Sequence, residues 1–535
     1  MIEAASLLAP AVLLPTLIVI HVLVGYLRNP LRKIPAAHPT AHVSSLWIAW
    51  VRWRHIENAT LKEAHARLGP IVCLGPEEIS INCVKGGIRD VYGGGFEKVN
   101  AKNGYNWYSF FTNYSGTGNM FSTGSNRLHS QRKRMLSNIY SKSHVLASES
   151  LLVQASTIMY KRFLPYLESV YAGPEQGVLN IYALLSATTM DIVTSYIFGL
   201  RAGSNLIQNP QQLAWFLDLY YSRRSFNFWP QEFPRLTSLA EKWLGYRFSP
   251  KWVDEANSKI ERWVTKMCDE ATRVLDAGVA AAGVEDRPVV YQQLQNSMAK
   301  EASKSLGGLP DPTAMASEVL DHLAAGFDTS GITLDYVVHE LSKHPDIQTR
   351  LQDELLGLSP RLAASSAPNL PDPKAVDALP LLHSVIWETL RLHSAIPGPQ
   401  PRFTPPQGCR LGPTDEKSYH VPGGVRVSAS AGLLHLNDDV YECASEWRPD
   451  RWLGLDKVAD DKRRDMESRW FWAFGSGGRM CVGSHLAVYQ MKYIVAALYS
   501  NYRTTIIDDT GIKQSDSYTA PPQSEKLMIR LEKLT

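Results

Sequence analysis

Residues Phe474–Gly483 read FGSGGRMCVG, and this stretch is the strongest indicator of the fold. Three glycines among residues 475–478 allow tight or left-handed backbone conformations and a close approach to a flat ligand. Cys481 follows at once, just before a predicted helix start near Gly483. Amides at a helix start stabilise negative charge, which favours the thiolate that a soft or borderline metal binds. Arg479 lies two residues before Cys481, where it could pair with an anionic group of a cofactor that contains this metal.

Other interpretations of this loop have less support. An isolated cysteine is most often a small buried residue, and glycine-rich loops at helix starts also bind phosphate. However, the Gly-Lys-Ser/Thr ending of a Walker loop is absent, and the six cysteines include no C-x-x-C pair. The complete pattern F-x-x-G-x-R-x-C-x-G resembles the heme-binding loop of the cytochrome P450 family. This resemblance implies that Cys481 is the axial ligand of a heme b iron, in a loop whose matching residues are Phe474, Gly477, Arg479 and Gly483.

A second match lies within a predicted helix from Thr313 to Ser342. Residues 325–330 read AGFDTS and resemble the oxygen-binding motif of the family's long central helix. Small residues at 325 and 326 would leave space for dioxygen and substrate, while Asp328 and Thr329 would hold and pass protons. The alternative is that Thr329 bonds back to its own helix backbone.

A third match is Glu388-Thr389-Leu390-Arg391, with opposite charges one helical turn apart. It resembles the family's E-x-x-R pair, which is buried and completed by a later arginine, here Arg451. The resemblance implies a structural role for the three charges in fixing the core around the cysteine loop.

A fourth match, His129 and Lys133, resembles the family's aromatic-x-x-x-basic signature for a heme propionate, with His in place of the usual Trp. Arg402 and His435 are weaker candidates for the same role. The alternative for Lys133 is a solvated basic helix face.

The chain as a whole is predicted to be mainly α with a minor β portion. Its composition, 44% hydrophobic and 20% charged, is that of a folded globular protein, and a net charge of +3 does not suggest nucleic-acid binding. Residues 70–81 alternate around a Gly-Pro turn and predict two short strands, and a final helix is predicted from about Gly483 to Tyr499.

The amino terminus contains an uncharged apolar run, Leu7–Leu27, long enough for a helix to cross a hydrocarbon core of roughly 30 Å. A cleaved signal peptide is the alternative, but no basic residue precedes the run, whereas Arg28 and Arg32 follow it. We therefore expect three parts: a transmembrane anchor (1–28), a proline-containing linker (29–42) and a monooxygenase domain (43–535).

The basic flank of the anchor predicts a single-pass protein of the endoplasmic reticulum membrane, with the catalytic domain in the cytosol. The sequons at Asn58 and Asn113 should then carry no glycan.

The resemblance implies a monooxygenase that inserts one oxygen atom of dioxygen into a small molecule. Electrons would come from NADPH through a separate NADPH–cytochrome P450 reductase, with cytochrome b5 as a second candidate donor. The segments that line the family's substrate pocket are rich in aromatic residues and leucine, which favours an apolar or aromatic substrate; they are residues 105–121, 213–226, 320–325, 394–399 and 518–521. The microsomal enzymes of fungi are the most similar group, which suggests secondary metabolism.

Other functions of the same heme-thiolate fold are an isomerase, a dehydratase or a peroxide-driven enzyme without a reductase. A heme sensor or carrier is a non-enzymatic alternative. The intact Asp328-Thr329 pair favours the monooxygenase.

Overall fold

The computed structural model describes residues 20, 22–278, 283–304 and 311–534 of the 535-residue chain. The expected anchor, residues 1–28, lies mostly outside the described residues, and residues 22–28 are helical. Two compact units are formed. Among the described residues, the first comprises those up to Asn106 together with Gly398–Leu434 and Ser476–Arg479, and the second comprises those of 107–397, 435–475 and 480–534.

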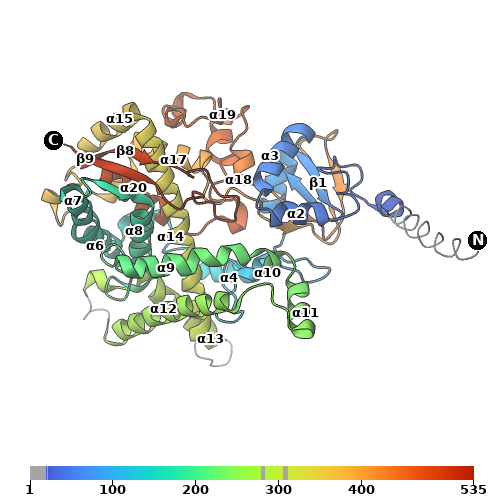
Figure 1. Ribbon diagram of the computed structural model, residues 1–535, viewed down its shortest axis with the longest axis horizontal. Coiled ribbons are helices and arrows are strands. Elements are labelled where there is room, and N and C mark those ends of the chain that lie inside the picture. Colours follow the sequence, from blue (N-terminus) through green and yellow to red (C-terminus); the bar gives the residue numbers. More distant parts are fainter. Residues whose placement is uncertain (1–19, 21, 279–282, 305–310, 535) are drawn as a thin grey trace, which may run out of the picture. The chain divides into compact units, whose positions relative to one another are not determined.

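The first unit is built on a four-stranded sheet of order β1-β2-β7-β4. The two predicted strands are confirmed, because β1 (Ile71–Gly75) and β2 (Glu78–Ile81) pair antiparallel with Ile71 opposite Ile81. Figure 1 shows α2 and α3 beside β1, and their apolar side chains share a core with Val72 and Leu74. The other elements are α2 (Leu46–Trp53), α3 (Glu57–Leu68), η1 (Val84–Gly93), β4 (Arg402–Phe403), β5 (Cys409–Leu411), β6 (Tyr419–Val421), β7 (Arg426–Ser428), α18 (Ala431–Leu434) and η10 (Gly477–Arg479).

Residues 29–42, the expected linker, lie against this sheet. The backbone N–H of Cys73 donates to the Pro35 carbonyl at 2.8 Å, and the Asn29 side-chain amide donates to the His42 carbonyl at 2.6 Å. Leu31 and Ile34 are buried. The segment is therefore a fixed part of the first unit.

The second unit is mainly helical, as predicted. Its three-stranded sheet has the order β3-β9-β8, and the two long strands β8 and β9 are the red arrows near the carboxyl terminus in Figure 1. The longer elements are α4 (Asn126–Leu136), α6 (Glu149–Ile158), α7 (Leu164–Ala172), α8 (Ile181–Phe198), α9 (Pro210–Ser222), α11 (Pro234–Leu244), α12 (Lys251–Asp276), α13 (Val289–Lys304), α14 (Pro312–Lys343), α15 (Pro345–Leu356), α17 (Pro380–Leu392) and α20 (Ser484–Tyr499). The shorter ones are η2 (Trp107–Phe111), α5 (Lys142–Ala147), η3 (Met159–Phe163), β3 (Val178–Asn180), η4 (Arg223–Phe226), α10 (Phe228–Glu232), η5 (Val284–Asp286), η6 (Ala364–Ser366), α16 (Pro373–Asp377), η7 (Pro449–Trp452), η8 (Leu455–Lys457), α19 (Asp460–Arg464), η9 (Asp465–Arg469), β8 (Tyr502–Asp508) and β9 (Met528–Lys533).

The core of this unit centres on α8 and α14. Helix α8 is enclosed on all sides, and every residue from Leu184 to Phe198 is buried. It is the one described helix with the length and hydropathy to cross a membrane, but 94% of that window is buried inside the protein. The predicted long helix around residues 313–342 is confirmed as α14, and the predicted final helix is confirmed as α20.

Asp335 is an acidic residue in the middle of this core. Its side chain is fully buried, and neither carboxylate oxygen has a hydrogen-bond partner in the described part of the chain. Desolvation raises the pKa of Asp335 well above its ordinary value. The Asp335 carboxyl group therefore ionises at a lower pH in the unfolded chain than in the folded protein. As a result, Asp335 destabilises the fold at neutral pH.

Replacing this acid by an apolar residue of similar size should stabilise the protein. We expect Asp335→Leu to raise the free energy of unfolding at pH 7 by about 2 kcal/mol, measured by urea denaturation. The gain should shrink below about pH 4, where the unfolded carboxyl is also protonated. Asp353→Leu, on the exposed face of α15, is the matched control and should change stability by no more than about 0.5 kcal/mol. An equal effect of the two substitutions would contradict the argument.

Candidate active site

The Cys481 thiol lies at the amino-terminal end of α20. The backbone N–H of Cys481 donates to the Phe474 carbonyl at 2.9 Å, which closes the loop, and the thiol is free and exposed. Desolvation by the neighbouring protein raises the pKa of Cys481, while the amides of Gly483 and Ser484 and the charge of Lys133 lower it. Because the thiolate is the ligand form of cysteine, binding of a metal would displace the thiol proton.

The part of the loop that belongs to the first unit contains Gly477 and Arg479. Gly477 has φ +68°, and a Cβ there would lie 2.2 Å from the Tyr92 carbonyl oxygen. Glycine is therefore required at this position by a close approach to the protein backbone. Arg402 is in the same unit, with its guanidinium 4.9 Å from the centre of the Tyr92 ring. Arg479 is half-buried within η10.

Helix α4 carries the predicted pair His129 and Lys133. His129 is buried, and the Lys133 ammonium donates to the Met480 carbonyl at 2.8 Å. Lys133 therefore contacts the cysteine loop directly. The adjacent Arg132 forms an ion pair of 2.7 Å with the buried Glu318 of α14.

The AGFDTS motif lies in the middle of α14. Ala325 is exposed, although the flanking helix is largely buried. A Cβ at Gly326 would meet a Val193 methyl group at 2.8 Å, so this glycine allows α14 to pack against α8. A side chain at residue 326 would collide with Val193, so the helix packing requires a small residue here. The Thr329 hydroxyl donates to the Ala325 carbonyl at 2.8 Å, as in the alternative interpretation of the motif.

Asp328 points away from solvent into a polar cluster. Arg224 donates to its carboxylate at 2.8 Å, and the Tyr221 hydroxyl donates at 3.3 Å. The Tyr221 and Tyr182 hydroxyls are 2.7 Å apart. These partners could not be predicted, because Arg224 and Tyr221 precede Asp328 by more than a hundred residues and belong to no local pattern.

Glu388 is the centre of a buried charge cluster. Arg391 binds both of its oxygens at 2.7 and 2.8 Å, and Arg451 donates at 2.9 Å. The Trp452 indole N–H donates at 2.9 Å, and the backbone N–H of Arg448 at 2.8 Å. Burial opposes ionisation, but the two arginines hold the pKa of Glu388 below its ordinary value. Trp452 was not predicted, although it directly follows Arg451 in the sequence.

His435 is a core histidine. Its Nε2 accepts from the Trp472 backbone N–H at 2.7 Å, and its Nδ1 lies 2.8 Å from the Arg391 carbonyl. Burial lowers the pKa of His435 to about 3. Both ring nitrogens are thus occupied by protein groups, which excludes the role of propionate ligand in this arrangement.

The residues of the cysteine loop fit an iron porphyrin. The loop offers one exposed soft donor, and no cluster of three or more His, Cys, Asp or Glu side chains suited to a metal ion occurs among the described residues. A Cβ at Gly478 or Gly483 would meet no atom within 4 Å, so the loop leaves open space at these positions. A single thiolate ligand suits a metal whose other ligands come from a macrocycle.

Comparison with known proteins supports this interpretation. The family model for cytochrome P450 matches residues 38–528. The chain belongs to the cytochrome P450 family. The cytochrome P450 monooxygenase hkm5 of Aspergillus hancockii is 26% identical and covers 93% of this chain and 90% of its own. A cytochrome P450 monooxygenase of Aspergillus terreus is 27% identical (91% and 92%), and the fusicoccadiene C-8 hydroxylase of Alternaria brassicicola is 24% identical (92% and 88%).

This cytochrome P450 is therefore a heme-thiolate monooxygenase that uses heme b and receives electrons from NADPH through a reductase. Its substrate is a small molecule.

Proposed function

We propose that this cytochrome P450 oxidises an apolar or aromatic small molecule in fungal secondary metabolism. The observation that carries the proposal is an aromatic cluster in the second unit. The Tyr518 ring lies 5.6 Å from Trp107, 5.2 Å from Phe111 and 6.1 Å from Phe121, between ring centroids. Residues 105–121 and 518–521, two of the segments expected to line the substrate pocket, are thus in contact. Aromatic walls favour apolar ligands, and one relative is named a hydroxylase of fusicoccadiene.

Cys481 is proposed as the axial ligand of the heme, with Phe474, Gly477 and Gly483 shaping its loop. His129, Lys133, Arg402 and Arg479 are proposed to provide the cationic and hydrogen-bonding groups for the propionates. Bound heme supplies the oxygen-activating chemistry, and the thiolate donates electron density to it.

Asp328 and Thr329 are proposed to deliver protons. Asp328 is held by Arg224 and Tyr221, so its carboxylate must leave Arg224 and take up a proton from solvent before it can pass that proton to the Thr329 hydroxyl. The Thr329 hydroxyl in turn must release the Ala325 carbonyl to donate elsewhere. Rotation of these two side chains would couple proton delivery to opening of the Arg224 ion pair.

The test is turnover with purified reductase, NADPH and isotopically labelled dioxygen. We expect one labelled oxygen atom in the product, and a rate about 10²-fold lower for Asp328→Asn because it removes the proton carrier. Asp335→Asn removes an acid from the same helix and should leave the rate unchanged. Product formation at the parent rate without NADPH and reductase would instead support the isomerase-type or peroxide-driven alternatives.

We further propose that residues 1–28 form a single-pass anchor in the endoplasmic reticulum membrane, followed by the segment 29–42 and a cytosolic monooxygenase domain (43–535), with cytochrome b5 as a second electron donor. Helix α11 supports membrane contact, since Trp243 and Leu244 at its end are 73% and 80% exposed. A glycan at Asn58 or Asn113 would contradict the proposed topology. If added cytochrome b5 left the rate of product formation unchanged, its proposed role as an electron donor would be contradicted.

A further inference from the structure

A cavity of about 430 Å³ lies within the second unit, among α5, α16, α17, α20 and the chain after η7. Cys481 and the aromatic cluster around Tyr518 do not line it. The volume falls within the range of small-molecule sites, which is roughly 300–1,000 Å³. The function of the monooxygenase described above makes no use of this cavity.

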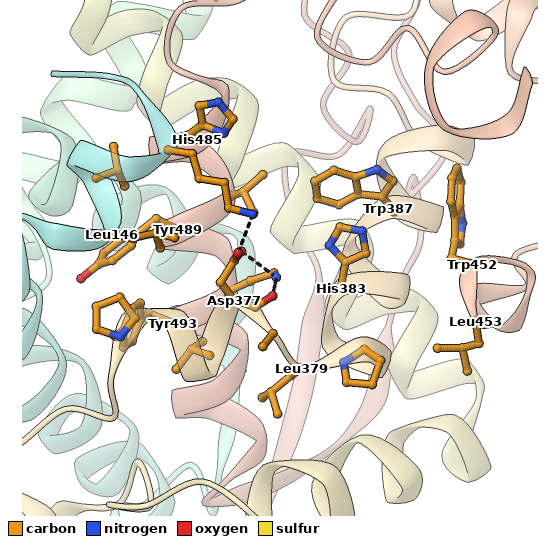
Figure 2. Close-up of a pocket in the computed structure, with 18 of the residues that line it drawn as sticks. Leu146, Asp377, Leu379, His383, Trp387, Trp452, Leu453, His485, Tyr489 and Tyr493 are labelled. Atoms are coloured by element: carbon orange, nitrogen blue, oxygen red, sulfur yellow. Dashed lines mark hydrogen bonds and ion pairs between the residues drawn. The ribbon is translucent and has the colours of Figure 1, made fainter. Parts of the chain in front are cut away.

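One side of the cavity is a rigid aromatic wall, shown in Figure 2. The Trp387 ring stacks on His383 with centroids 3.9 Å apart and on Phe471 with centroids 5.9 Å apart. The Trp452 indole is fixed by its bond to Glu388. Because these rings are already held in place, a flat ligand would bind without the entropy cost of ordering them.

The lining also carries two ammonium groups, Lys142 and Lys492, and the carboxylate of Asp377. The Asp377 carboxylate pairs with Lys142 at 2.7 Å and with Lys492 at 3.0 Å, and dashed lines mark interactions of this carboxylate in Figure 2. The Lys492 side chain is 2% exposed, whereas that of Lys142 is 59% exposed. An ammonium has three donors, so Lys142 can bind a second carboxylate beside Asp377.

Two neutral histidines complete the lining. Burial lowers the pKa of His383 to about 4 and also lowers that of His485. At neutral pH each imidazole has one N–H donor and one acceptor nitrogen, which can bind the polar end of a ligand without adding charge. The cavity thus combines flat apolar walls with the partly exposed ammonium group of Lys142.

We propose that this cavity is a second small-molecule site of the cytochrome P450, and that it binds an aromatic monocarboxylate. The ring lies against Trp387 and Trp452, and the carboxylate pairs with Lys142. A neutral molecule of the same shape gains only the ring contacts, and an aromatic cation is repelled by the lysines.

The test is isothermal titration of the full-length heme-loaded protein with 2-naphthoate, beside the neutral 2-naphthylmethanol. We expect saturable binding of 2-naphthoate that Lys142→Gln weakens about fivefold, as expected for loss of one partly exposed ion pair. Leu379→Trp fills the cavity and should remove this binding. Lys161→Gln removes an exposed lysine outside the cavity and should alter the affinity by less than about twofold.

Three outcomes would overturn the proposal. They are no saturable binding of 2-naphthoate, equal affinities in the Lys142→Gln and Lys161→Gln proteins, or equal affinities for the acid and the alcohol. Binding of 2-naphthoate beside the heme would appear as equal affinities in the two lysine variants. Lys142→Gln keeps the proposal testable if Leu379→Trp does not fold, because Lys142 is mainly exposed.

Discussion

The Cys481→Ala protein should lose the long-wavelength Soret band that the reduced parent protein shows with carbon monoxide. The band reports thiolate ligation of the iron, and Cys481 provides the one thiol of the loop. The loop itself should persist, because its closing bond runs from the backbone N–H of residue 481 to the Phe474 carbonyl. The expected effect is therefore a complete loss of the band without global unfolding.

Cys443→Ala is the matched control for this experiment. Cys443 is also a free, exposed thiol of the second unit, so its removal makes the same chemical change away from the predicted ligand. The control should retain the band in full. A well-folded Cys481→Ala protein that still shows the band, or a folded heme-loaded parent that never shows it, would contradict Cys481 as the thiolate ligand.

Glu388→Ala should produce the second largest effect, a loss of heme incorporation together with a loss of stability. The substitution leaves Arg391 and Arg451 without their carboxylate, and the Arg391 and Glu388 side chains are both 0% exposed. Removing one member of a buried ion cluster costs about 3–5 kcal/mol, because the remaining charges stay in a desolvated site. The ratio of heme to protein and the urea midpoint measure the two effects.

The exposed ion pair of Arg350 and Asp450 gives the control. It has comparable geometry, with distances of 2.6 and 3.0 Å, but its side chains are 45% and 55% exposed. Asp450→Asn should therefore cost no more than about 1 kcal/mol and leave heme content unchanged. Similar losses in both variants would show that the effect of Glu388 does not arise from its burial.

The same cluster predicts a direction for the pH dependence of stability. Because the folded-state pKa of Glu388 is lowered, its contribution is present above the pKa of an unfolded glutamate. It is lost as the pH falls through the folded-state value. Asp335 acts in the opposite sense. Because its folded-state pKa is raised, its destabilising effect on the fold disappears in acid.

Much of the architecture could be predicted because it depends on short stretches of sequence. The alternation of residues 70–81 predicted β1 and β2, and the helical pattern of residues 313–342 predicted α14. The spacing in FGSGGRMCVG singled out the cysteine of a family loop. Strand alternation, helical periodicity and glycine turns are local properties, so a single sequence contains them.

The sequence by itself thus determined the helical fold class, the cysteine loop and the family. The tertiary structure alone decided which groups those residues meet: Arg224 on Asp328, Val193 against Gly326, Met480 as the partner of Lys133, and a core position for His435. Arg224 and Asp328 are 104 residues apart, and no local pattern connects them. Such contacts arise when whole helices pack, because packing fixes which side chains face one another across the core and which charges must find partners there.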